Sequence, residues 1–367
     1  VMVRHLYIHV PFCHRICPYC NFYKHTPGGT DQSAFIRALL TELEERSREC
    51  DLRPETIYLG GGTPTALSGK HLGKLLEGIT NALAMENLTE WGIEANPATF
   101  NQNKAQLMRD AGITRVSLGI QSWTPSTLAT LGRDHSPEDA RASFEVLRAC
   151  GFPSLNIDMM FSIPGQSPES WLADLEHTVA LSPDLISAYN LNYEEDTEFF
   201  ERLSNGEFQE NSGQDIAFFT SAMETLGQAG YEHYEISNYA RPGHHSRHNS
   251  AYWSGADYLG IGPGAFTTYN GTRWRNLPNT GEYINQSANK NLAALVTEHE
   301  QIDDMAFRAE RIALQLRTSD GIRMEILGPA REKVPELAAE GLVETRDGSI
   351  ILTDKGKLLA DSVASHL

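Results

Sequence analysis

The segment YIHVPFCHRICPYCNFY, residues 7–23, contains Cys13, Cys17 and Cys20 in a C-x₃-C-x₂-C pattern. The chain of 367 residues has only five cysteines, and three of them lie within these eight positions. Thiolates bind soft metals, and close spacing on one loop allows three of them to reach a single metal group. The segment therefore predicts a metal or iron–sulfur site directly after a short β-strand.

Spacing alone leaves three interpretations of this site. Three thiolates on a four-iron cluster leave one iron without a protein ligand, so an external molecule can bind it. A zinc ion would need a fourth ligand, for which His9 and His14 are the candidates. The residues could also be ordinary buried cysteines, which is how we interpret the isolated Cys50 and Cys150. The tight clustering favours the iron–sulfur interpretation.

The composition narrows the class of protein. Lys and Arg number 30 against 48 Asp and Glu, and the net charge of −18 disfavours binding to a nucleic-acid backbone. No apolar run approaches the roughly 20 residues that span a membrane. The first residues, VMVRHLYIHV, lack the long apolar segment of a signal peptide. We expect a soluble cytoplasmic protein in a reducing compartment, without a nucleic-acid partner or a transmembrane segment.

Short β-rich runs alternate with amphipathic stretches through the first two thirds of the chain. Helices are predicted over residues 33–50, 137–151 and 168–183. Six strands are predicted, over residues 5–10, 56–60, 91–95, 115–120, 155–160 and 185–191. Six strand–helix repeats favour an α/β fold whose parallel sheet is barrel-like or doubly wound.

The pattern changes near residue 301. Helices are predicted over residues 305–317 and 326–342, followed by a hairpin around Asp347–Gly348 and a last helix over 354–364. This order resembles a winged-helix α+β module. Because residues 301–367 carry 12 acidic and 9 basic residues, we expect the module to pack against the sheet domain and not to bind DNA.

The cysteine motif after the first strand, with Tyr19 before its last cysteine, resembles that of the radical S-adenosylmethionine (SAM) superfamily. This resemblance implies a partial (β/α)6 barrel, a [4Fe–4S] cluster on Cys13, Cys17 and Cys20, and SAM bound through its amino and carboxylate groups to the free iron. Reduction of the cluster would require an electron donor. Carbon–sulfur bond cleavage in SAM is the chemistry that the resemblance implies.

Polar residues follow the later strands, where ligands bind in barrels. The turn GGGTPT (60–65) lets the backbone approach a ligand closely, and Asp158 is a carboxylate inside an apolar strand. These positions resemble those of the oxygen-independent coproporphyrinogen III oxidase-like family. The resemblance implies that SAM is contacted by Tyr7, Gly61, Gly62, Thr63, Glu94, Gln121, Arg133, Asp158 and Asn192.

Two features separate the branches of that family. The coproporphyrinogen III dehydrogenase has a fourth cysteine where this chain has Phe22, and it has an N-terminal extension that we expect to be missing here. The segment HNSAYW, residues 248–253, matches the H-N-x-x-Y-W motif of the heme-chaperone branch, HemW. This resemblance implies heme binding at His248, with His244 and His245 as rival axial ligands, and delivery of heme to acceptors such as respiratory enzymes.

The predicted organisation has three parts. Residues 1–230 form the radical SAM barrel with the cluster and SAM site, residues 231–300 extend the barrel and carry HNSAYW, and residues 301–367 form the C-terminal winged-helix module. The predicted function is a heme chaperone without coproporphyrinogen oxidase activity. The alternatives are a radical SAM C-methyltransferase or cyclopropanase of the same family, the coproporphyrinogen III dehydrogenase, and a zinc-bound non-catalytic scaffold.

Overall fold

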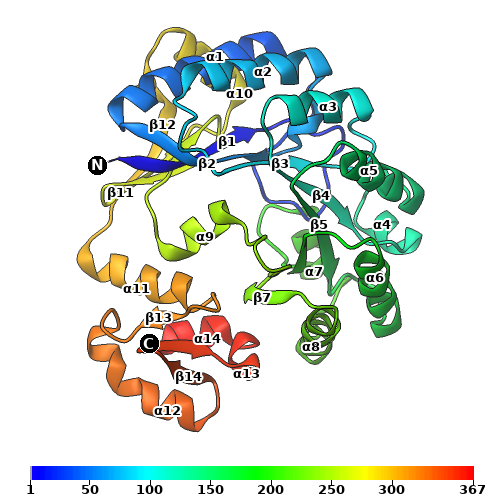
Figure 1. Cartoon of the computed structure of the whole chain (residues 1–367), viewed down its shortest axis with the longest axis vertical. Coiled ribbons are helices and arrows are strands. Elements are labelled where there is room, and N and C mark those ends of the chain that lie inside the picture. Colours follow the sequence, from blue (N-terminus) through cyan, green and yellow to red (C-terminus); the bar gives the residue numbers. More distant parts are fainter. Residues whose placement is uncertain (1) are drawn as a thin grey trace.

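A computed structural model describes residues 2–367 and shows one large curved sheet with a small module beside it (Figure 1). In this part of the chain the large sheet has nine strands in the order β7-β8-β6-β5-β4-β3-β2-β1-β9. Its six central strands are parallel and match the six predicted ones: β1 (Val3–Val10), β2 (Leu52–Gly61), β3 (Glu90–Ala95), β4 (Arg115–Gln121), β5 (Ser154–Phe161) and β6 (Leu185–Asn190).

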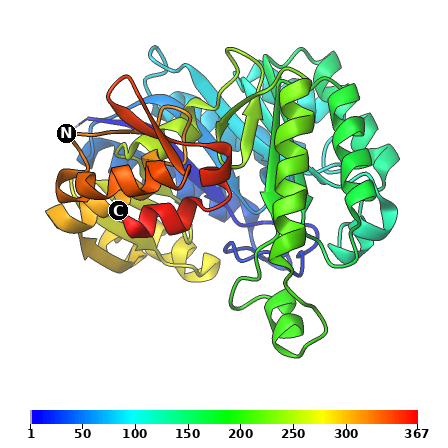
Figure 2. The same cartoon turned by 90° about the horizontal axis from the view of Figure 1, so that it is seen from below.

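Helices cover the outer face of the parallel strands (Figure 1). They are α1 (Gln32–Glu49), α2 (Gly69–Ala82), α3 (Gln102–Asp110), α4 (Pro125–Thr130), α5 (Pro137–Ala149), α6 (Pro168–Ala180) and α8 (Ser212–Gln228). All of them except α4, which begins with a proline, start with a side-chain cap. Asp31 accepts two backbone hydrogen bonds at the start of α1, and Ser136 with Asp139 forms a capping box on α5. The short α7 (Glu198–Ser204) lies in a lobe that projects from the body (Figure 2).

The two faces of the parallel strands differ in polarity. Along β5, Leu155, Ile157 and Met159 are buried in the main core, whereas Asn156 and Asp158 line an internal cavity. The interior of a closed barrel is normally filled by branched apolar side chains. Here the inner face is polar, so the concave side of the sheet is a place for ligands.

Residues 231–300 extend the same body. Strand β9 (Leu259–Ile261) pairs in parallel with β1, and β7 (Glu232–Glu235) and β8 (Asn238–Ala240) continue the sheet antiparallel beyond β6. A second sheet contains β10 (Phe266–Tyr269), β11 (Thr272–Asn276) and β12 (Val296–Gln301), with α10 (Thr280–Ala288) between its strands. Several buried residues of this region, among them Tyr239, Leu259 and Tyr283, belong to the main core. The sequence did not predict these edge strands.

Helix α9 (Arg247–Ser254) lies between the large sheet and the C-terminal module (Figure 1). The module contains α11 (Asp304–Gln315), α12 (Val334–Ala339), α13 (Asp354–Lys357), α14 (Ala360–His366) and a sheet in the order β13-β15-β14 (Ile322–Arg323, Ser349–Leu352, Val343–Arg346). It has a core of its own. The predicted hairpin is present, with positive φ at Asp347 and Gly348. The predicted last helix is split between α13 and α14.

No helix among residues 2–367 is long and apolar enough to cross a membrane.

Candidate cluster and ligand-binding site

A cavity of about 430 Å³ lies on the concave side of the sheet and reaches the carboxyl ends of its strands. Most residues singled out from the sequence line it: Cys13, Cys17, Cys20, Gly61, Gly62, Thr63, Glu94, Gln121, Arg133, Asp158 and Asn192. Tyr7 and His248 do not line it. The structure therefore gathers residues from the loop after β1 and from β2 to β6 around one space.

The cysteine loop is held at both ends. Phe12 and His25 form an isolated bridge, and the backbone N–H of Cys13 donates to the carbonyl of His25 at 3.0 Å. The three thiols are partly buried. Burial raises the pKa of Cys13 to about 11, against a hydrogen bond from Thr63 that favours the thiolate. Burial also raises the pKa of Cys20. Cys13 and Cys20 are therefore harder to ionise than a free thiol, and a bound cation would favour their thiolates.

The glycine turn after β2 lies directly against this loop. The N–H of Gly62 donates to Val10 O at 2.8 Å, and the N–H of Thr63 donates to Phe12 O at 2.7 Å. Gly61 has a φ of +104°, and a Cβ there would lie 2.4 Å from the ring of His9. Only glycine fits this position, so the turn brings backbone to the cavity wall.

Two carboxyl groups share the cavity. Glu94 accepts a hydrogen bond from the N–H of Gly61 at 3.1 Å, and Asp158 accepts one from Asn156 at 2.7 Å. Burial, and then the charge of Asp158, raises the pKa of Glu94 to about 8. Burial also raises the pKa of Asp158. A cationic ligand in this space would offset the cost of ionising both groups.

Arg133 and Gln121 present unpaired atoms to the same space. Arg133 donates to Asn96 Oδ1 at 2.8 Å, to Gly119 O at 2.6 Å and to Cys17 Sγ at 3.5 Å. Its Nε and the Oε1 of Gln121 are buried, without a hydrogen-bond partner in the described chain. Gln121 also has a φ of +72°, a strained conformation found mostly at functional sites. Buried unpaired polar atoms indicate a ligand or ordered water.

Two wall residues were missed in the sequence. Asn96 donates to Thr63 Oγ1 at 2.9 Å and accepts from Arg133, and so it joins the glycine turn to that guanidinium. It follows β3 directly, so the rule that located Glu94 also applies to it. Tyr58 lines the cavity from within β2. The alternation of inward and outward positions along that strand could have identified it.

Tyr7 and the two candidate fourth ligands for zinc have other partners. Tyr7 Oη lies 3.0 Å from His9 Nδ1, and His9 Nε2 lies 2.7 Å from Tyr23 O. Both ring nitrogens of His9 are thus engaged, and burial lowers its pKa to about 4. His14 Nε2 lies 3.3 Å from Ala66 O. His9 has no free nitrogen to complete a zinc site.

The HNSAYW segment forms most of α9, and its side chains point in different directions. His248 is fully buried, with Nδ1 2.8 Å from Thr56 Oγ1 and Nε2 3.0 Å from Tyr252 Oη. It stacks on Tyr58, with ring centroids 5.2 Å apart. Trp253 instead packs beside Arg317 of the C-terminal module. In this conformation both ring nitrogens of His248 have protein partners, and its role in heme binding stays a prediction.

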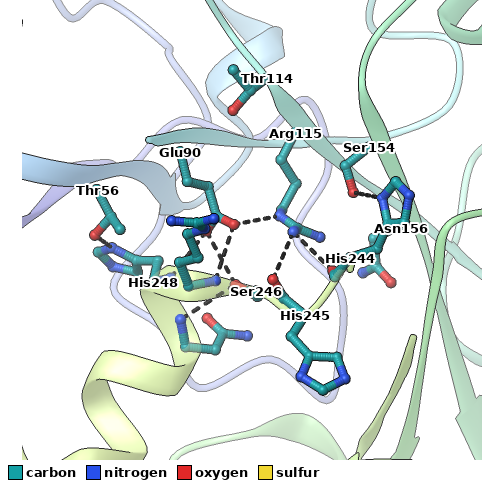
Figure 3. Close-up of polar contacts among 12 residues, drawn as sticks. Thr56, Glu90, Thr114, Arg115, Ser154, Asn156, His244, His245, Ser246 and His248 are labelled. Atoms are coloured by element: carbon teal, nitrogen blue, oxygen red, sulfur yellow. Dashed lines mark hydrogen bonds and ion pairs between the residues drawn. The ribbon is translucent and has the colours of Figure 1, made fainter. Parts of the chain in front are cut away.

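A buried ion pair fixes the start of α9 (Figure 3). Glu90 accepts hydrogen bonds from Arg115 Nε and from the backbone N–H groups of Arg247 and His248, each at 3.0 Å. Arg115 also donates to the carbonyls of His244 and His245. A buried pair with these additional bonds specifies one backbone position strongly.

His244 and His245 are more accessible than His248, with side chains 32% and 41% exposed. His245 Nε2 lies 2.8 Å from Glu232 Oε2, and its ring stacks on Tyr234. His245 also lines an open groove of about 380 Å³ on the side of α9 away from the cysteines, together with His5 and Arg247.

Comparison with known proteins agrees with this geometry. The radical SAM superfamily model matches residues 7–178. The heme chaperone HemW of Mycobacterium tuberculosis is 36% identical over 99% of this chain and 94% of its own length, and that of Bacillus subtilis is 34% identical over 97% of each. The chain belongs to the HemW family. HemW of Escherichia coli is 37% identical over 71% of this chain and 68% of its own length.

The fold of this HemW-family chain also occurs in coproporphyrinogen III oxidase (HemN) from Escherichia coli. That structure superposes with a TM-score of 0.84 over 99% of this chain and 89% of its own, at 21% identity. The predicted radical SAM fold and the predicted family branch are both confirmed.

Proposed function

We propose that this HemW-family protein is a cytoplasmic heme chaperone that carries a [4Fe–4S] cluster, SAM and heme and transfers the heme to acceptor proteins. The main support is identity to named heme chaperones over nearly the whole chain, together with three thiols converging on one cavity. Respiratory enzymes are the proposed acceptors. Coproporphyrinogen oxidation is not expected, because Phe22 stands where that enzyme has a further cysteine.

The cluster would be held by Cys13, Cys17 and Cys20. The three thiols of the loop fit such a cluster. The rest of the cavity wall consists of backbone and other side chains and contains no further cysteine among the described lining residues. A cluster held there would supply one-electron reduction chemistry to SAM bound beside it, and an electron donor would be needed to reduce it. Arg133, which contacts Cys17, would balance part of the negative charge of the thiolates.

SAM would occupy the remaining space at the carboxyl ends of the strands. The cationic groups of SAM suit the carboxylates of Glu94 and Asp158. Its ribose hydroxyls and the polar edge of its adenine ring suit the unpaired atoms of Gln121 and Arg133. Gly61, Gly62 and Thr63 offer backbone groups, and Asn192 lies at the exposed mouth. Tyr7 would act indirectly, through His9.

For heme, the geometry of α9 favours a division of roles within the predicted histidines. We assign His248 to positioning, because both its ring nitrogens bind neighbours. His245 is the better-placed axial ligand, since its Nε2 is fixed by Glu232 and its other nitrogen remains available. A carboxylate on one imidazole nitrogen is a common way to orient a metal-binding histidine. In the same groove, Arg247 would pair with a heme carboxylate and His5 would lie against the heme face.

The proposed function is tested by anaerobic reconstitution with iron and sulfide, followed by titration with heme. We expect a cluster absorbance, a separate Soret band at about one heme per chain, and loss of that band to an added apo-hemoprotein. Absence of heme binding, combined with SAM-dependent methylation of a small molecule, would instead support the methyltransferase alternative.

A further inference from the structure

The cavity extends well below the proposed cluster and SAM site. On β4 it is lined both by Gln121, at the carboxyl end, and by Arg115, six residues earlier, which is about 20 Å along an extended strand. Among the residues proposed to bind the cluster or SAM, Asp158 contacts this lower level through a hydrogen bond from Asn156 at 2.7 Å. We define the floor of the cavity by four lining residues, Arg115, Asn156, Ser246 and Asn249.

Arg115 is the central residue of the floor. Its side chain is only 6% exposed. Nε donates to Glu90 at 3.0 Å, and Nη2 donates to His244 O at 2.9 Å and to His245 O at 3.1 Å. The remaining nitrogen, Nη1, is buried and has no partner within residues 2–367. Figure 3 shows the guanidinium with its bonds to Glu90 and to the two carbonyls.

The ion pair with Glu90 neutralises the positive charge of Arg115 only in part. The two share a single hydrogen bond, and the carboxylate also accepts from Ser246 Oγ and from two backbone N–H groups at the start of α9. The amino end of a helix stabilises a carboxylate independently of any cation. Because the guanidinium of Arg115 makes one hydrogen bond to the Glu90 carboxylate and Nη1 makes none, positive potential remains around Nη1.

Two other residues of the floor carry polar side chains. Asn156 is 5% exposed, and its Oδ1 is buried without a partner among the described residues. Asn249 lines the floor from α9, so its amide can donate to a bound group. Leaving such atoms unpaired in the interior costs free energy, which a ligand with matching groups removes.

We propose that the floor of the cavity is a binding subsite for the carboxylate of a second ligand, which enters the barrel beneath SAM. Arg115 Nη1 and the amide of Asn249 donate to the carboxylate. Asn156 accepts from a neighbouring donor or an ordered water. The subsite stands on this geometry and does not depend on the proposed heme function.

The test uses trifluoroacetate as probe and the cluster-loaded, SAM-bound protein, so that the upper site is filled. Fluorine NMR line broadening measures its binding, and neutral trifluoroacetamide is the matched ligand. Asn249→Asp is nearly isosteric, is acceptable in the first turn of α9 and places a negative charge on the floor. We expect it to weaken trifluoroacetate binding at least tenfold and to leave trifluoroacetamide unaffected. Asn285→Asp, which adds the same charge on an exposed surface, should change neither.

Arg115→Lys keeps the charge opposite Glu90 but lacks the free nitrogen, and should also weaken trifluoroacetate binding at least tenfold. Iron content and SAM affinity report whether each variant is folded. Equal trifluoroacetate affinity in wild type and Asn249→Asp, or no broadening in the wild type, would overturn the proposal.

A second arm identifies the source of the carboxylate. If a heme propionate supplies it, Asn249→Asp lowers the affinity for heme but not for heme dimethyl ester. If a free organic acid supplies it, both hemes bind the wild type and the variant equally, while the trifluoroacetate difference remains. Failure of heme to bind at all would refute the proposed function alone, because the fluorine experiment contains no heme.

Discussion

The two ends of the barrel cavity are built differently. At the carboxyl ends of the strands, residues from the cysteine loop, the glycine turn and four strands converge on one space. At the other end, α9 carries a contiguous motif whose side chains separate, with His248 buried against Thr56 and Trp253 against the C-terminal module. Convergence at a strand edge follows from topology, whereas the direction of a helical side chain depends on what packs around the helix.

The largest expected effect lies in the cysteine loop. Replacing Cys13, Cys17 and Cys20 by Ala should abolish the cluster, because thiolates are its only strong ligands in the proposed site. Iron and acid-labile sulfide per chain measure this directly. Cys150→Ala is the matched control and should retain full iron content. Iron retained in the triple variant would show that the cluster is held elsewhere.

SAM affinity should change next most strongly. Asp158→Ala removes a buried carboxylate from the proposed site and should weaken SAM binding by about tenfold to a hundredfold, the effect of losing one charge-assisted hydrogen bond. Calorimetry on the cluster-loaded protein measures it. Glu145→Gln, on the exposed side of α5, is the control. Unchanged SAM affinity in Asp158→Ala would remove β5 from the site.

Substitutions of His245 and His248 should have different effects on heme binding, and both effects should be smaller than those at the cluster and SAM sites. His245→Ala should shift the Soret band and lower heme affinity by about tenfold, a 1.4 kcal/mol effect. His248→Ala should mainly lower the melting temperature, since it leaves Thr56 and Tyr252 without their shared partner. A Soret change confined to His248→Ala would restore the original sequence assignment and require α9 to rearrange.

The smallest effect concerns pH. The pKa of Glu94 is about 8 in the fold, against an ordinary value of 4.5, so the folded protein holds this proton more tightly than the unfolded chain. Its contribution to the free energy of unfolding therefore falls as pH rises from about 4.5 to about 8. Urea unfolding of the cluster-free chain should show a shallower decline in Glu94→Gln than in wild type. Equal slopes would mean that Glu94 is ionised before ligands bind.

The parallel strands could be predicted because each depends on local signals, whereas the full set of upper-site residues was implied by the family resemblance. A polar residue at the end of an apolar strand, as with Glu94 and Gln121, is visible in one window of residues. The edge strands were missed because β9 contributes only three residues and forms through its partner β1. The Glu90–Arg115 pair joins positions 25 residues apart to the start of α9, and no local pattern reveals such a network.

The most direct test of the central claim is heme transfer under anaerobic conditions. Cluster-loaded, SAM-bound protein carrying one heme is mixed with an apo-hemoprotein, and the two are separated and scanned for Soret absorbance. We expect heme to move to the acceptor while iron and sulfide remain with the chain. Heme that stays bound to the chain, or a chain that never binds heme and methylates a substrate instead, would contradict it.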